Sequence, residues 1–214
     1  MIAARSIFVW FFWGSLLLAG TAPACSRGDS APSSAEAALP SAEAALPELG
    51  KVGPFALTDQ AGERVDNATL AGKPWVAAFM VTRCPTVCPR ITAEMKKLQA
   101  AAKQKGVSLH WVSFSVDPEH DTPEVLRGYA ASNAIDTSNW SLLTGDLAAI
   151  KKTSVDSFKL ALDGTADPNK DHLGILHGSH LVLVDAAGTI RGYYATNDPE
   201  ALKKLLVDAA RLPK

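Results

Sequence analysis

The chain has 214 residues, and its 21 Lys and Arg residues nearly balance its 22 Asp and Glu residues, which gives a formal net charge of −1. This balance excludes a nucleic-acid binder that works through bulk electrostatic attraction, because such a protein needs an excess or a stripe of basic residues. The hydrophobic content of 47% excludes a wholly disordered chain, and the 3 cysteines are too few for a disulfide-rich secreted scaffold.

The first 24 residues have the pattern of a targeting segment. Arg5 provides a positive flank, Ile7 to Gly20 form an apolar run, and Ala22-Pro23-Ala24 matches a small-x-small cleavage pattern. Three interpretations remain open: a cleaved secretory signal, a lipoprotein that is lipidated on Cys25, or an uncut anchor at the short limit of a bilayer span. All three place the rest of the protein outside the cytoplasm, either tethered or secreted.

Residues 25–50 form a low-complexity segment rich in Ala, Pro, Ser and Glu. The heptad SAEAALP occurs twice, at 34–40 and 41–47, and each copy ends in a proline that stops a helix. We expect this segment to be a linker and residues 51–214 to form one folded domain.

The domain is predicted to alternate between strands and helices. Continuous apolar runs at 75–81 and 107–116 are typical of strands buried on both faces. One helix is expected around Pro89 and as far as about Lys105, and another from Thr122, a suitable N-cap that precedes Pro123. The other predicted elements are a hairpin at 55–65, a connector at 140–144, a helix at 146–155, a loop at 163–173, a hairpin at 180–194 and a closing helix at 198–212.

This order of elements predicts an α/β sandwich with a mixed central sheet, an N-terminal hairpin extension and flanking helices. A single right-handed crossover is expected to join the two buried strands.

Cys84 and Cys88, the only cysteines of this domain, lie in the segment CPTVCP between a buried strand and the following helix. Open α/β sheets bind ligands at such strand ends. Unpaired N–H groups and the partial positive charge of a helix amino terminus favour thiolate over thiol. A turn between Pro85 and Pro89 is expected to be partly exposed, which disfavours two inert buried thiols.

Three roles remain open for this pair: a redox dithiol, a permanent disulfide and a clamp for a soft metal ion. Residues four apart on a helix have Cβ atoms about 5–6 Å apart, whereas a disulfide needs about 3.5–4.5 Å. A bridge therefore requires some adjustment, and two sulfurs around one ion fit at least as well. Two thiolates with one imidazole make a soft, low-coordinate site of the kind that selects Cu(I).

The imidazole would come from one of five histidines. His110 is expected to pack within a buried strand, and His120 and His172 lie in polar segments that favour exposed side chains. His177 precedes the strand that begins at His180, and the loop entering that strand is expected to face the cysteine turn. His177 is therefore the first candidate and His180 the second.

Together these motifs resemble those of the Sco/SenC family. They are TRCPTVCP at 82–89, SVDPEHDTP at 115–123, WSLLTG at 140–145, His177 eight residues before Asp185, and GTIRGYY at 188–194. One difference is Gly178, since family members often have Ser directly after the ligand histidine. This difference and the nearby His180 leave the histidine ligand ambiguous.

The resemblance implies a thioredoxin-like fold and copper, as Cu(I) or Cu(II), bound by Cys84, Cys88 and His177, with Asp117 in a supporting role. It also implies tethering on the periplasmic side of the bacterial inner membrane. The implied function is delivery of copper to the binuclear copper site of cytochrome c oxidase, or reduction of the thiols there. The copper-site subunit of the oxidase is then the expected partner, while the copper donor stays open.

The main alternative is an enzyme, a thiol–disulfide oxidoreductase in which Cys84 attacks and Cys88 resolves. The three-residue spacer argues mildly against it, because thioredoxin-type redox motifs have two residues between the cysteines. A copper or redox sensor is less favoured still, because the sequence has no output domain.

Overall fold

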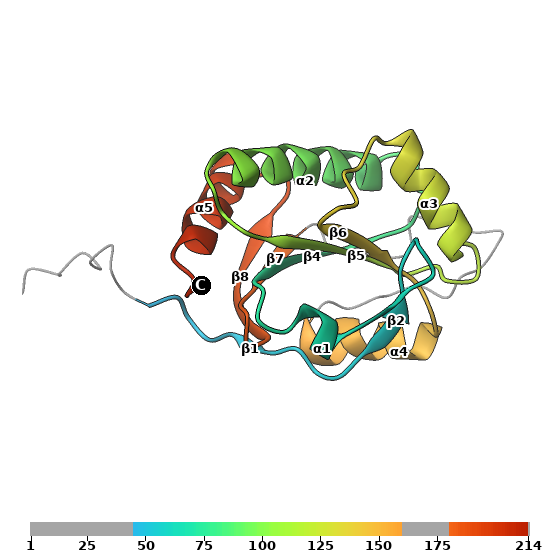
Figure 1. Ribbon diagram of the computed structural model, residues 1–214, viewed down its shortest axis with the longest axis horizontal. Coiled ribbons are helices and arrows are strands. Elements are labelled where there is room, and N and C mark those ends of the chain that lie inside the picture. Colours follow the sequence, from blue (N-terminus) through green and yellow to red (C-terminus); the bar gives the residue numbers. More distant parts are fainter. Residues whose placement is uncertain (1–44, 160–179, 214) are drawn as a thin grey trace, which may run out of the picture. The chain divides into compact units, whose positions relative to one another are not determined.

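The computed structural model describes residues 45–159 and 180–213. The predicted leader, most of the linker, the predicted loop at 163–173, His172 and His177 lie outside these residues. The centre of the domain is a six-stranded sheet with the strand order β1-β8-β7-β4-β5-β6 (Figure 1). Its strands are β1 (Gly50–Lys51), β4 (Trp75–Met80), β5 (His110–Ser115), β6 (Trp140–Leu143), β7 (His180–Val184) and β8 (Thr189–Ala195).

The sheet is mixed, as predicted. Strands β4, β5 and β6 are parallel, while β7 is antiparallel to β4, β8 to β7 and β1 to β8. A separate hairpin pairs β2 (Ala56–Thr58) with β3 (Arg64–Asp66), which confirms the predicted extension.

Helices cover both faces of the sheet. Figure 1 shows α2 and α5 on one side of it and α1 and α4 on the other. The helices are α1 (Asn67–Leu70), α2 (Val87–Gln104), α3 (Pro123–Ser132), α4 (Leu147–Lys152) with a π-helical turn at Thr153–Ser157, and α5 (Pro199–Ala210). Within the described ranges, no helix has the length and apolar character needed to cross a membrane.

The central strands are buried on both faces because their side chains are apolar on both faces. All six residues of β4 are buried, and Phe79 and Phe114 on the adjacent strand stack with ring centroids 5.1 Å apart. Phe158, after α4, meets Phe79 edge-on at 5.4 Å. This aromatic cluster packs the segment after α4 against the two central strands, β4 and β5.

Side-chain caps mark the starts of three helices, and the cap predicted at Thr122 is confirmed. The Thr122 side chain accepts a hydrogen bond from the Val125 N–H, with Pro123 in the first turn. Asp146 and Asp198 cap α4 and α5 in the same way. Because β5 and β6 are parallel, the loops that follow them, before α3 and α4, lie at the same edge of the sheet.

The segment at 140–144 is a strand rather than the predicted connector. Trp140–Leu143 pairs in parallel with β5, and all four residues are buried. The sheet therefore contains two successive parallel βαβ units, β4-α2-β5 and β5-α3-β6, instead of one. Four residues are too few to show strand periodicity, so the pairing with β5 decides the conformation.

Candidate dithiol site

The two cysteines lie together at the carboxyl edge of the parallel strands. Cys84 is in the turn that follows β4, and Cys88 is in the first turn of α2. Both are free thiols. The expected exposure holds for the turn but is wrong for the sulfurs: Pro85, Thr86 and Pro89 are exposed, whereas both cysteines are buried.

The burial of Cys88 follows from where the helix begins. Because α2 starts at Val87, Cys88 shares the inward face of the helix with Ile91, Thr92 and Met95, all of which are buried. Cys88 is 0% exposed and Cys84 is 4% exposed. The two thiols are thus covered by their own turn rather than displayed on it.

The environment of Cys84 favours its thiolate. Burial is the largest single influence and raises the pKa, but hydrogen bonds from the backbone N–H groups of Cys88, Thr86 and Val87 together outweigh it. The pKa of the Cys84 thiol is therefore lowered. This is the helix-terminus effect that the sequence predicts.

Cys88 behaves in the opposite way. Burial raises the pKa of its thiol to about 12, although the Val81 N–H lies 3.4 Å from its Sγ and opposes the shift. The neighbouring Cys84 raises it further. The prediction of two depressed pKa values is wrong for Cys88, because an N–H donor cannot offset the loss of water around a fully buried sulfur.

A buried carboxylate lies beneath the cysteine turn. Asp121, 0% exposed, accepts hydrogen bonds from the Thr82 N–H at 3.1 Å, from the Thr82 hydroxyl, and from the Ser115 hydroxyl at 2.6 Å. Thr82 follows β4, and Ser115 ends β5. Asp121 therefore joins the ends of the two central strands.

Asp117, which lies like Asp121 in the loop between β5 and α3, is also bonded to the cysteine turn. Arg83 Nε donates to Asp117 Oδ2 at 2.6 Å, and the Arg83 side chain is 35% exposed while that of Asp117 is 4% exposed. Both residues that directly precede Cys84 are thus bonded to the loop between β5 and α3. We name residues 117–122 the aspartate loop.

Most of these contacts were not predicted from the sequence. The family resemblance implied a supporting role for Asp117 alone and none for Thr82, Arg83, Ser115 or Asp121. The available signal was the DPEHD segment that follows a buried strand parallel to the cysteine strand, since the carboxyl ends of adjacent parallel strands meet at one edge.

The described histidines lie in three different settings. His110 begins β5, at the edge away from the cysteines, with Nε2 3.1 Å from Ser141 Oγ, and His120 is exposed in the aspartate loop. His180 is half-buried and opens β7, which runs antiparallel to β4, so it lies toward the cysteine edge. Over 45–159 and 180–213, no group of three His, Cys, Asp or Glu side chains is placed to hold a metal. His180 does not complete a site with the two cysteines in this arrangement, and His177 is outside the described residues.

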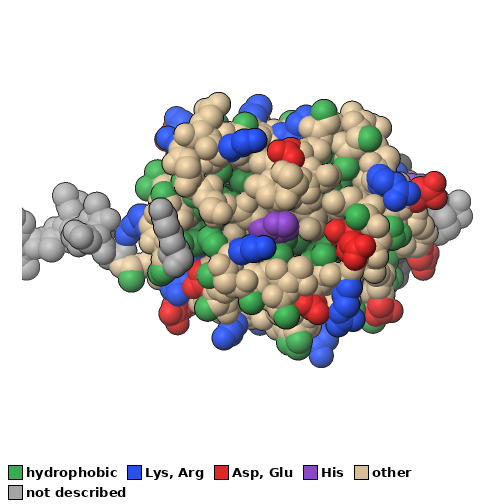
Figure 2. Space-filling view, in the orientation of Figure 1, with side chains coloured by type: hydrophobic (Ala, Val, Ile, Leu, Met, Phe, Trp, Pro, Cys, Tyr) green, Lys and Arg blue, Asp and Glu red, His purple; other side chains and the backbone are tan. Residues whose placement is uncertain are grey.

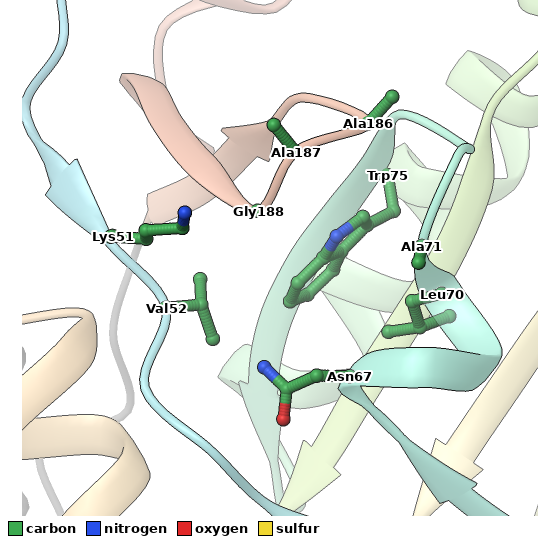
Figure 3. Close-up of a pocket in the computed structure, with 9 residues that line it drawn as sticks. All are labelled: Lys51, Val52, Asn67, Leu70, Ala71, Trp75, Ala186, Ala187 and Gly188. Carbon is green, nitrogen blue, oxygen red and sulfur yellow. The ribbon is translucent and has the colours of Figure 1, made fainter.

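Three pockets lie at the opposite edge of the sheet from the cysteines. One, of about 240 Å³, has the Trp75 indole at its centre and is closed by Val52, Leu70 and the Ala186–Gly188 turn (Figure 3). The other two, each of about 410 Å³, share Lys73, Val107 and Ser108. None of the three includes a cysteine.

The fold and the paired sulfurs define a thioredoxin-like dithiol domain. A sequence profile of the SCO1/SenC family matches residues 44–209. The chain belongs to this family.

Solved structures of relatives agree in fold. A SCO1/SenC family lipoprotein from Bacillus anthracis str. Ames is 39% identical, with a TM-score of 0.69 over 77% of this chain and 96% of that one. BsSco, described as a member of the Sco family of cytochrome c oxidase assembly proteins with a disulfide switch, is 31% identical with a TM-score of 0.69 over 78% and 97% of the two chains. Bradyrhizobium japonicum ScoI, solved with copper bound, is 28% identical with a TM-score of 0.63 over 76% and 99%.

Proposed function

We propose that this protein binds copper outside the cytoplasm and assists assembly of the binuclear copper centre of cytochrome c oxidase. The observation that carries the proposal is the convergence of Cys84 and Cys88 at the carboxyl edge of the sheet, both as free thiols. Two family members support it: ScoI is solved with copper bound, and BsSco is described as belonging to a family of oxidase assembly proteins.

The residues present suit a soft ion. Thiolate sulfur selects Cu(I) over harder cations, and the lowered pKa of Cys84 makes one thiolate available at neutral pH. Cys88 has a pKa of about 12, so it is protonated at neutral pH, and coordination of a metal ion would displace that proton. Copper is the cargo in this scheme, so a site of few ligands would allow its exchange onto the cysteines of a partner.

We propose His177 as the third ligand. The described residues offer no third His, Cys, Asp or Glu grouped with the two sulfurs, and His177 stands three residues before β7, which starts toward the cysteine edge. His180 is the comparison residue, because it lies in the same stretch of chain and is half-buried.

The test is an anaerobic Cu(I) titration of the protein, with bound metal and free thiols counted together. We expect one copper per chain, its loss in Cys84→Ser and Cys88→Ser, and weaker binding in His177→Ala but not in His180→Ala. Full affinity in His177→Ala would remove that residue from the site. Absence of copper binding by the parent protein would refute the metal function.

The asymmetry of the thiols favours a second candidate, thiol–disulfide reduction. The Cys84 thiolate would attack a partner disulfide and expel one partner thiolate, forming a mixed disulfide. The Cys88 thiol would then lose its proton and attack Cys84 Sγ, which releases the second partner thiol and leaves a Cys84–Cys88 disulfide. Turnover of insulin or a partner disulfide without metal, together with no retained copper, would place this activity first.

We propose that the domain is held on the periplasmic side of the inner membrane by its N-terminal segment. The apolar run at 7–20 and Cys25 after small residues support this location, and the relative from Bacillus anthracis is described as a lipoprotein. Labelled fatty acid incorporated by the parent but not by Cys25→Ser would support lipidation. A parent that remains unlabelled and partitions with cytoplasmic protein would refute both anchoring and export.

A further inference from the structure

Asp121 is the most completely buried charged side chain near the dithiol. Its carboxylate has 0% exposure, and its three side-chain hydrogen bonds come from neutral groups, two on Thr82 and one on Ser115. The backbone of Asp121 is fixed as well, because its N–H donates to the Asp117 carbonyl at 2.9 Å. A buried carboxylate with these partners fixes their positions, since a donor that loses it would be left unsatisfied.

The position of Thr82 makes these bonds relevant to the sulfurs. Only Arg83 separates Thr82 from Cys84, and the Cys84 N–H donates back to the Val81 carbonyl at 3.4 Å. The turn is therefore short and tight. The other bond from the aspartate loop, between Arg83 and Asp117, uses a partly exposed guanidinium, so water competes with it. The bonds to this turn whose carboxylate is fully buried are those of Asp121.

We propose that Asp121 is a positioning residue of the dithiol site: through Thr82 it holds the Cys84 turn in the place that copper binding and disulfide closure with Cys88 both require. The first of these roles rests on the proposed function, whereas the second concerns the thiols alone. Within the described residues, Asp121 makes no hydrogen bond to either sulfur, and its contact with the cysteine turn is through the backbone and hydroxyl of Thr82.

The main test replaces Asp121 by asparagine, which keeps the volume but leaves one acceptor oxygen for the three donors. We expect the Cu(I) dissociation constant of Asp121→Asn to rise by about tenfold, the lower end of what loss of an outer-shell partner causes. We also expect the metal-free dithiol–disulfide equilibrium with glutathione to shift by about threefold or more. In that equilibrium, oxidised glutathione takes two electrons from Cys84 and Cys88 and yields one protein disulfide and two glutathione thiols.

Asp185→Asn is the matched control. Asp185 is also buried and accepts hydrogen bonds from two backbone N–H groups, Ala187 at 2.9 Å and Thr189 at 2.8 Å, and from Arg191. It follows β7 and lies beside the first residue of β4. This is the end of the sheet opposite the cysteines. We expect this variant to lose stability while it keeps the parent values for copper and for glutathione.

Thr82→Val provides an independent variant that removes only the hydroxyl donor and keeps the N–H bond. A smaller shift of both quantities in the same direction is expected, and the effects of Thr82→Val and Asp121→Asn should not add in the double variant. Parent values of both quantities in Asp121→Asn would overturn the proposal. If Asp121→Asn does not fold, parent values in Thr82→Val would overturn it equally. Should the parent bind no copper, the metal function fails, and the glutathione equilibrium alone decides the role of Asp121.

Discussion

Cys84 and Cys88 have opposite protonation preferences although they are only four residues apart. The pKa of Cys84 lies below its ordinary 9.0 because three backbone N–H groups outweigh the effect of burial. The pKa of Cys88 is about 12 because burial dominates there. Since the thiolate is the nucleophile, the two sulfurs should be chemically distinguishable in the reduced, metal-free protein.

We therefore expect iodoacetamide to alkylate Cys84 at least about ten times faster than Cys88 near pH 7.5, even after allowance for the weaker nucleophilicity of a low-pKa thiolate. Peptide mass spectrometry over a time course measures both rates. The Cys84→Ser variant should leave only the slow reaction. Equal rates, or Cys88 reacting first, would show that access rather than protonation controls this site.

His110 gives a prediction for the dependence of stability on pH. Burial, and secondarily the charge of Lys73, lowers the pKa of His110 in the folded state below the ordinary 6.5. Below pH 6.5 the unfolded chain then binds more protons than the folded one, so the free energy of unfolding should fall as the pH drops until the folded pKa is passed. Urea unfolding at pH 7.5, 6.5 and 5.5 should show a shallower fall for His110→Gln than for the parent.

The exposed His120 provides the control for that measurement. His120→Gln should retain the slope of the parent. If His110→Gln and His120→Gln change the dependence of the free energy of unfolding on pH to the same extent, burial of His110 is not the cause of that dependence.

For single residues, the sequence identifies the reactive cysteines better than it identifies the residues that hold their turn in place. Cys84 and Cys88 were predictable because their spacing, their prolines and a buried strand before them are local features. Thr82 and Asp121 are 39 residues apart, and their bond exists only because β4 and β5 are neighbours in the sheet. His177 remains a prediction.

Strand β6 shows how tertiary contacts decide the conformation of a short element. The hairpin β2–β3 lies along it: Thr58 and Thr144 exchange two backbone hydrogen bonds of 2.8 Å. Gln60, in the hairpin turn and 8% exposed, continues this pairing. Its Nε2 donates to the Trp140 carbonyl at 3.3 Å, and its Oε1 accepts from the Leu142 N–H at 2.7 Å. The hairpin thus covers a sheet edge that would otherwise present unpaired backbone groups.

We expect Gln60→Ala to lower the free energy of unfolding by about 1–3 kcal/mol, because it leaves buried groups of β6 without partners. Urea denaturation measures this change, and Gln104→Ala, an exposed position at the end of α2, is the matched control. A loss no greater than that of the control would mean that water replaces the Gln60 side chain at the edge.

The helices and central strands were the most predictable elements. Long apolar runs marked β4 and β5, and the cap at Thr122 and the helix expected from 198 marked the starts of α3 and α5 within a residue. Strand β6 was missed because WSLL carries no periodic signal of its own, and its partners, strand β5 and the Gln60 side chain, are distant in the chain.

Across the whole domain, the dithiol and the three pockets lie at opposite edges of the sheet. The cysteine turn and the aspartate loop lie at the carboxyl ends of β4 and β5, while three pockets lie at the other edge. Figure 2 shows basic and acidic side chains interspersed over the visible face, as the near-neutral net charge predicts.

Copper at that edge should stabilise the entire domain, because it would join the turn after β4 to the first turn of α2. At a free Cu(I) concentration 100 times the dissociation constant, mass action contributes about 2.7 kcal/mol. In a domain of this size that raises the Tm by roughly 5–11 °C. Anaerobic thermal scans of the reduced protein with and without Cu(I) measure the shift. Cys84→Ser, Cys88→Ser and the oxidised parent should show none, because each lacks one or both thiol ligands. The same rise in Cys84→Ser would place the stabilising copper elsewhere on the surface.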